Sequence, residues 1–181
     1  EHSVFGCDLW VEVTATSSPP GCNEILDLML VLDRSGSINA TELTDLKNAA
    51  NAFITALAPS AAGVHTGQSS FSTAGTLDLH LTDVEADAHT AINNLAAGGF
   101  TNLKEGIDLA ADEMDDLHVH ERPLVKDVMV IITDGAPNRP LPSTTADDVA
   151  AASADAARAE GIEIFVVGVG VSPATTIYLE N

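Results

Sequence analysis

Apolar residues in this chain form either continuous runs or helically spaced patterns. Three almost uninterrupted runs occupy residues 25–32 (ILDLMLVL), 125–133 (VKDVMVIIT) and 162–171 (IEIFVVGVGV). Such runs are typical of parallel strands that are covered on both faces. The segments between them carry apolar residues at helical spacing. Strands that alternate with helices predict an α/β fold with a doubly wound, mostly parallel sheet flanked by helices.

Capping boxes predict the starts of two helices. Asn39 with Glu42 three residues later forms a capping box for the helix after the first run, and Thr82 with Glu85 predicts another. A further helix, with one apolar face, is expected over residues 103–117.

Two further strands are expected between the first two helices. Residues 62–72 give only a weak strand prediction, because positions 68–70 are polar where apolar residues are expected. Residues 76–81 alternate leucine with Asp78 and His80, which predicts a half-exposed edge strand.

The first 22 residues differ from the rest. Residues 9–14 alternate as in a strand, and the Ser/Pro/Gly stretch 17–21 breaks the pattern. We interpret 1–22 as an N-terminal extension or the end of a preceding module, appended to one domain over 23–181. The chain's two cysteines, Cys7 and Cys22, both lie in this segment. A disulfide between them is preferred over free thiols, and it would imply an oxidising compartment.

The net charge and the lengths of the apolar runs limit the kinds of partner and location that are expected for this protein. The formal net charge is −20, which disfavours binding to nucleic acid or to anionic membranes. No apolar run approaches the roughly 18 residues that a membrane helix needs, so membrane insertion is not expected. The chain starts at Glu1 without a signal peptide, and we interpret it as a mature product or a fragment.

Candidate metal-binding residues follow the first apolar run. Asp33, Ser35 and Ser37 stand at alternate positions, so their side chains can point the same way. Their oxygens suit Mg²⁺, Mn²⁺ or Ca²⁺. A turn that caps the next helix would use the same residue types. Asp134 ends the second run and Thr101 precedes a helix, so five oxygen-bearing side chains are expected at the carboxyl edge of the sheet.

Three segments resemble one family. The pattern D-x-S-x-S at 33–37, G-G-x-T at 98–101 and T-D-G at 133–135 is similar to that of the von Willebrand factor type A (VWA) domain, over about residues 24–171. The resemblance implies a metal-ion-dependent adhesion site (MIDAS). In it Ser35, Ser37 and Thr101 would bind the metal through hydroxyls, and Asp33 and Asp134 would bind directly or through water. It also implies Mg²⁺, with Mn²⁺ or Ca²⁺ possible, and a partner carboxylate in the remaining position.

The expected function is an extracellular or cell-surface adhesion or assembly module, not an enzyme. Neither a G-x-S-x-G elbow nor a phosphate-binding loop occurs in the sequence. The alternative is an intracellular VWA scaffold of a chaperone-like or chelatase-type complex. The chain also stops where the family adds a helix and a strand, so assembly through exposed sheet edges, as in a filament, is a further hypothesis.

For several other residues the sequence allows more than one role. Arg34, Lys104 and Arg139 lie in or beside the site loops and either attract an acidic partner or pair with nearby acids. His118 and His120 alternate as a metal pair could, but without an obvious further ligand a solvated connection is the preferred interpretation. The other histidines, including His80, are left unassigned. Asn39 lies in a glycosylation sequon, although the helix cap is its expected use.

Overall fold

The computed structural model describes residues 25–169, and these form a five-stranded sheet with four α-helices. In chain order the elements are β1 (Leu26–Asp33), α1 (Ala40–Leu57), β2 (Val64–Phe71), β3 (Gly75–Thr82), α2 (Glu85–Asn93), α3 (Leu103–Glu113), β4 (Lys126–Thr133), a 3₁₀ turn (Ser143–Thr145), α4 (Ala146–Ala159) and β5 (Glu163–Gly168). The strand order is β3-β2-β1-β4-β5, and only β3 runs antiparallel to its neighbour. The predicted α/β class with a mostly parallel sheet is therefore confirmed.

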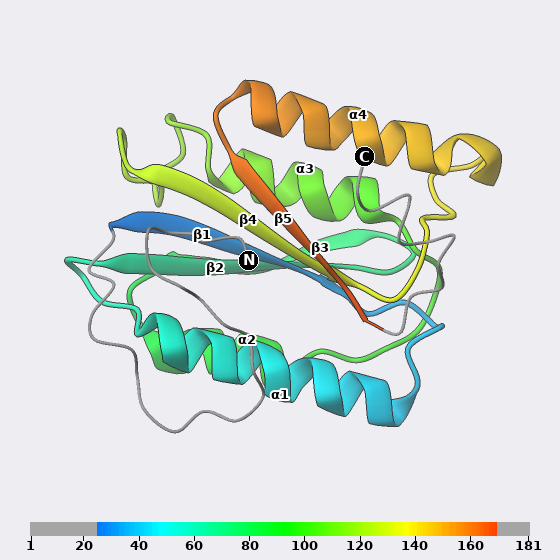
Figure 1. Cartoon of the computed structure of the whole chain (residues 1–181), viewed down its shortest axis with the longest axis horizontal. Helices are drawn as coiled ribbons and strands as arrows, with labels where there is room; N and C mark the ends of the chain where they lie inside the picture. The colour runs from blue at the N-terminus through cyan, green and yellow to red at the C-terminus, as the bar shows by residue number, and fades with distance from the viewer. Residues whose placement is uncertain (1–24, 170–181) are drawn as a thin grey trace, which may run out of the picture.

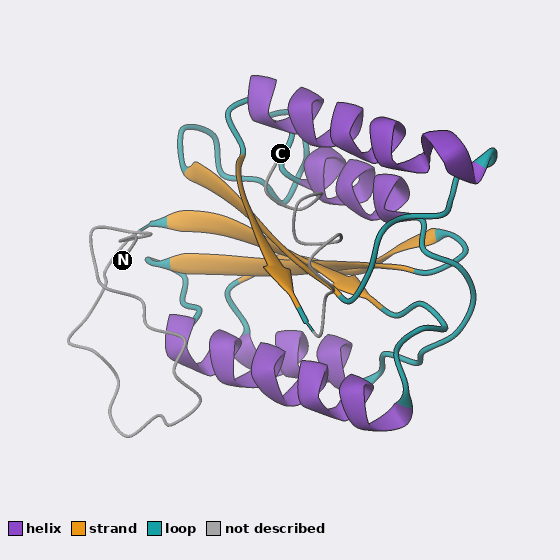
Figure 2. Cartoon of the chain, turned by 45° about the vertical axis from the view of Figure 1, so that its right-hand side comes forward, coloured by secondary structure: helices purple, strands orange, loops and turns teal. Residues whose placement is uncertain are grey.

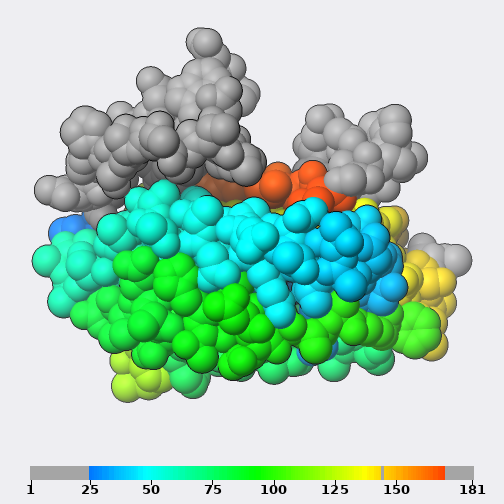
Figure 3. All heavy atoms as spheres, turned by 90° about the horizontal axis from the view of Figure 1, so that it is seen from below, coloured from blue at the N-terminus to red at the C-terminus, as the bar shows by residue number. Residues whose placement is uncertain are grey.

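The helices cover both faces of the sheet. α1 and α2 lie on one face and α3 and α4 on the other (Figures 1 and 2). Seen from below, the side chains of α1 and α2 form a continuous layer (Figure 3). Successive side chains of β1 supply the two cores in turn: Leu28 and Leu30 pack with α1 and α2, whereas Met29 and Val31 pack with α3 and α4. A doubly covered strand explains the continuous apolar run.

The topology places the candidate site. From β1 the chain goes to β2 and β3 on one side, and it then crosses to β4 on the other side of β1. β1 and β4 run in register up to the pair Leu32 and Ile132, so their carboxyl ends lie next to each other. Ligands of open parallel sheets bind at such a switch point.

The predicted helix boundaries are partly wrong. The capping box of α1 is present, since the Asn39 side chain accepts from the backbone of Glu42 and Glu42 accepts in return. The second box is absent: Thr82 ends β3, and its hydroxyl accepts from the backbone N–H of Val84, which is the N-cap of α2. α3 ends at Glu113, four residues before the expected end. Leu117 lies beyond it and is almost fully exposed.

The polar stretch of β2 is buried between β1 and β3, and each of its three side chains has a hydrogen-bond partner, although Oε1 of Gln68 has none within residues 25–169. The Ser69 hydroxyl donates to the carbonyl of Gly106 in α3 (2.8 Å), and the Gln68 amide donates to Asp78 (3.2 Å). Ser70 accepts from Arg34. Buried polar groups are tolerated when they are paired in this way.

Some predictions fall outside the described residues. The strand at 9–14, the Cys7–Cys22 disulfide and the end of the chain beyond 169 belong to this group and stay predictions. Among residues 25–169, no helix combines the length and the apolar character needed to cross a membrane.

Candidate metal site

Asp33, the last residue of β1, forms the base of the site. Its carboxylate is fully buried and is held from two sides. The backbone N–H of Ser35 donates to Oδ1 (2.8 Å), and the hydroxyl of Thr133 at the end of β4 donates to Oδ2 (2.7 Å). These two bonds fix the orientation of the carboxylate at the junction of the two strands.

Three further oxygens form a chain beside Asp33. The Ser35 and Ser37 hydroxyls lie 2.9 Å apart, and the Ser37 hydroxyl donates to Oδ1 of Asp134 (2.9 Å). Ser35 is buried, whereas Ser37 is exposed and Asp134 is half-buried, so this oxygen chain runs from the interior to the surface. The alternate positions of the D-x-S-x-S segment thus converge as predicted.

Thr101 reaches the same edge through a third loop. The backbone N–H of Gly36 donates to the carbonyl of Gly99 (3.0 Å), and the N–H of Gly98 donates to the carbonyl of Arg34 (2.8 Å). A Cβ at Gly36 would lie 2.9 Å from the Gly99 oxygen, so this close approach requires glycine. Thr101 itself is buried.

The donor set fits a hard divalent cation. In an octahedron with bonds of about 2.1 Å, adjacent ligands lie about 3.0 Å apart, close to the spacing of the Ser35, Ser37 and Asp134 oxygens. Burial raises the pKa of Asp33, and the charge of Asp134 raises it further, against the hydrogen bonds from Ser35 and Thr133. A cation bound here would stabilise the ionised carboxylate.

The three basic residues near the site have different surroundings. Arg34 lies along β2 and β3, where it donates to the hydroxyls of Ser70, Ser72 and Thr76 at 2.9–3.0 Å. Lys104 pairs with Asp108 one turn further along α3. Arg139 stacks on the half-exposed ring of Phe100, 3.5 Å from its centroid. These contacts favour Arg139 over the other two for a role toward a partner.

Two residues that support the site were not identified from the sequence. Thr133 holds Asp33. Asn138 accepts from the backbone N–H of Thr101 (3.0 Å), and its own N–H donates to the Thr101 carbonyl (2.9 Å). The T-D-G pattern contains Thr133, so a hydrogen bond to the neighbouring strand could have been anticipated. Asn138 lies in an irregular proline-rich loop whose path no local pattern predicts.

The prediction for His118 and His120 is wrong. Residues 118–121 were expected to form a solvated connection without further ligands. Instead His118 and His120 are half-buried, and they face Glu113 of α3 together with His80 of β3. The partners come from distant parts of the sequence, and for this reason the local pattern did not show them.

A family comparison agrees with this geometry. The von Willebrand factor type A domain model matches residues 27–178. The chain therefore belongs to the VWA domain family, as the three motif segments predicted.

Solved structures share the fold at low sequence identity. The manganese-loaded TRAP protein of Plasmodium vivax is 20% identical with a TM-score of 0.71, and the alignment covers 88% of this chain and 63% of that one. Proximal thread matrix protein 1 of the mussel byssus, with a zinc-occupied MIDAS motif, is 23% identical with a TM-score of 0.67, over 87% of this chain and 39% of that one. The VWA domain of the type V pilus tip protein Mfa5 of Porphyromonas gingivalis is 19% identical with a TM-score of 0.58, over 70% and 44%. This chain thus spans less than two thirds of each of these three structures.

Proposed function

We propose that this domain is an adhesion or assembly module that binds a divalent cation and, through it, an acidic group of a protein or surface ligand. One observation carries the proposal: the loops after β1 and β4 bring the oxygens of Asp33, Ser35, Ser37 and Asp134 together at the carboxyl edge of the sheet, and backbone hydrogen bonds hold the loop that contains Thr101 beside them. Mg²⁺ is the preferred ion, with Mn²⁺ or Ca²⁺ as alternatives. The proposed setting is extracellular or at a cell surface, and the proposed role is binding, not catalysis.

The charge of the donor set favours a carboxylate ligand. Asp33 and Asp134 are the two acids among the five donors, so their charge of −2 neutralises a divalent cation without excess. A cation with few direct carboxylate ligands stays attractive to an incoming carboxylate. Arg139, held over Phe100 beside Thr101, adds positive charge at the rim. The fold shared with a pilus tip protein and a byssal matrix protein supports a role in assembly.

Calorimetric titration with Mn²⁺ and Mg²⁺ tests the proposal. The chain is first treated with chelator, and wild type is compared with Asp134→Ala and with Asp87→Ala. Asp87 is an exposed acid in the first turn of α2, outside the site, so its substitution makes the same charge change. We expect one ion per chain, an affinity loss of roughly 10-fold or more in Asp134→Ala, and little change in Asp87→Ala.

The carboxylate position is tested with ¹³C-acetate as the probe. Acetate that binds the protein-held Mn²⁺ should show paramagnetic line broadening that is lost in Asp134→Ala. Equal Mn²⁺ binding by all three proteins would refute the metal site. Mn²⁺ binding without acetate broadening would leave a metal site and refute the carboxylate ligand.

A further inference from the structure

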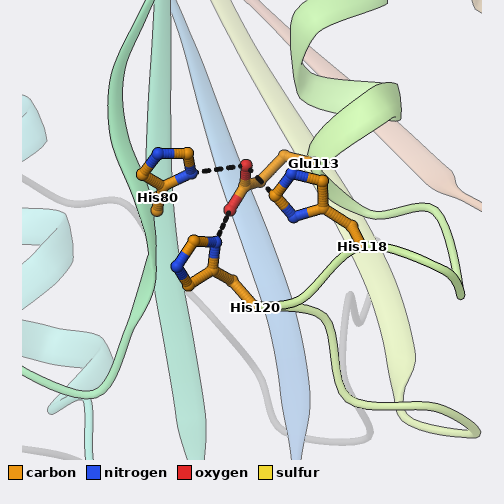
Figure 4. A group of neighbouring side chains, drawn as sticks. All are labelled: His80, Glu113, His118 and His120. Carbon is orange, nitrogen blue, oxygen red and sulfur yellow. Dashed lines mark hydrogen bonds and ion pairs between the residues drawn. The ribbon is translucent and has the colours of Figure 1, made fainter.

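Four side chains from three separate segments meet on the face of the sheet that α3 covers. His80 comes from β3, Glu113 from the last turn of α3, and His118 and His120 from the connection that leads to β4. Figure 4 shows the three imidazole rings arranged around the Glu113 carboxylate. One potential ligand atom from each of the four residues lies within 4.8 Å of all the others.

The distances are close to those of a metal site. Nδ1 of His80 and of His118 lie 2.8 and 3.5 Å from Oε2 of Glu113, and Nδ1 of His120 lies 3.4 Å from Oε1. With bonds of about 2.0–2.1 Å, adjacent ligands of a tetrahedral Zn²⁺ ion are about 3.3–3.5 Å apart. The distances of His118 and His120 match this spacing, each to a different oxygen of the carboxylate, and His80, whose side chain is 55% exposed, would have to move away by about 0.5 Å.

A backbone hydrogen bond and burial hold the Glu113 carboxylate in place. The backbone N–H of Leu81 donates to Oε1 of Glu113 (2.9 Å), which fixes the carboxylate between β3 and α3. The Glu113 side chain is fully buried, and its ion-pair contacts within residues 25–169 are all with histidines. Nδ1 of His118 and of His120 are buried without a hydrogen-bond partner of good geometry. A buried carboxylate and two unpartnered ring nitrogens are thus directed at the same place.

We propose that His80, Glu113, His118 and His120 form a second metal site that binds Zn²⁺. Three imidazoles and a carboxylate suit Zn²⁺ far better than Mg²⁺ or Ca²⁺, which prefer oxygen alone. Four protein ligands would close the coordination shell, so the role is structural: the ion ties β3 and the end of α3 to the connection before β4.

The Zn²⁺ site does not depend on the oxygen site at Asp33. Strand pairing places His80 near the level of Gly67 and Met29, four residues before Asp33 along β1. Four strand residues correspond to about 13 Å, so the two sites are distinct. They also differ in ligand chemistry, which allows one to be tested while the other is saturated with Mg²⁺.

The neighbouring acidic residues do not form an equally suitable metal site. Asp27, Glu121 and Asp127 also approach one another closely. There, however, the guanidinium of Arg122 already occupies Asp27 through two hydrogen bonds. A cation would have to compete with that arginine.

Titration with Co²⁺ and Zn²⁺ in excess Mg²⁺ tests the proposal on the full chain. Visible absorption detects Co²⁺ in a tetrahedral nitrogen-containing site. Wild type is compared with His120→Ala, with Asp134→Ala at the oxygen site, and with His89→Ala. His89 is the matched control, because it lies on α2 and contacts Asn51 and Glu85 instead of the cluster.

We expect one equivalent of Co²⁺ with tetrahedral absorption, displaced by Zn²⁺, in wild type, Asp134→Ala and His89→Ala. His120→Ala should lose roughly 100-fold or more in affinity. Zn²⁺ at about 100 times its Kd should raise the Tm of wild type by roughly 5–10 °C and that of His120→Ala by much less.

Two results would overturn the proposal: no tetrahedral Co²⁺ signal in wild type, or equal binding by His120→Ala and His89→Ala. Either would mean that the histidines bind Glu113 only through protons. Circular dichroism checks that His120→Ala is folded. If it is not, His80→Ala, with its more exposed side chain, takes its place with the same expected loss.

Discussion

Asp27 interrupts the apolar run of β1, and its environment leads to a quantitative prediction. Its side chain is fully buried in the sheet. Arg122, in the connection before β4, donates to Oδ1 from Nε (2.8 Å) and Nη2 (2.5 Å), and its backbone N–H donates to Oδ2 (3.1 Å). The same guanidinium also donates to the carbonyls of Gly63 and Leu26. One side chain therefore satisfies a buried charge and two carbonyls.

Replacing Arg122 by Met keeps much of the length of the side chain and removes its donors. Asp27 would then keep one backbone donor for a buried carboxylate. Loss of one partner of a buried ion pair costs about 3–5 kcal/mol. Because the Arg122 side chain is 21% exposed, we take the lower end, about 3 kcal/mol. For a domain of this size that corresponds to a Tm decrease of roughly 6–12 °C.

Urea denaturation followed by circular dichroism measures this loss. Arg158→Met is the control, because Arg158 pairs with the exposed Asp155 on α4 and should contribute less than about 0.5 kcal/mol. Adding Asp27→Asn to Arg122→Met should recover part of the stability, since the buried charge is gone. A loss below about 1 kcal/mol in Arg122→Met, or one equal to that of the control, would refute the reasoning.

Two further predictions concern Asp127 and Thr133. Burial raises the pKa of Asp127 to about 7, with the charges of Glu121 and Asp27 adding to it, so the folded protein binds a proton that the unfolded chain releases near pH 4. Stability should therefore fall between about pH 4 and 7. Asp127→Asn should remove this part of the decrease in stability. After allowance for solvent screening, the variant should be more stable than wild type by about 1–2 kcal/mol at pH 8. Urea denaturation at a series of pH values measures the difference, and parallel curves of stability against pH for the two proteins would contradict the prediction. Thr133→Val keeps the shape but removes the donor to Asp33, so Mn²⁺ affinity should fall roughly 10–100-fold by calorimetry, and unchanged affinity would exclude a positioning role.

Local information in the sequence was sufficient for much of this protein. The apolar run of β1 and the capping box at Asn39 depend on neighbouring residues, and both predicted the observed elements. The oxygen donors after β1 and β4 could also be predicted, because parallel strands bring their carboxyl ends to one edge of the sheet. Asp33, Ser35, Ser37 and Asp134 could thus be placed before the structure was known.

Tertiary structure decided what depends on distant partners. The polar side chains of β2 became compatible with a central strand only because α3 and β3 supply partners such as the Gly106 carbonyl. Asp27 is tolerated inside β1 because Arg122, 95 residues later, neutralises it. His80 and Glu113 meet the pair at 118 and 120 because β3, α3 and the connection before β4 converge. Periodicity reports which way a side chain points along its own element, whereas the groups that face it are determined by how the elements pack.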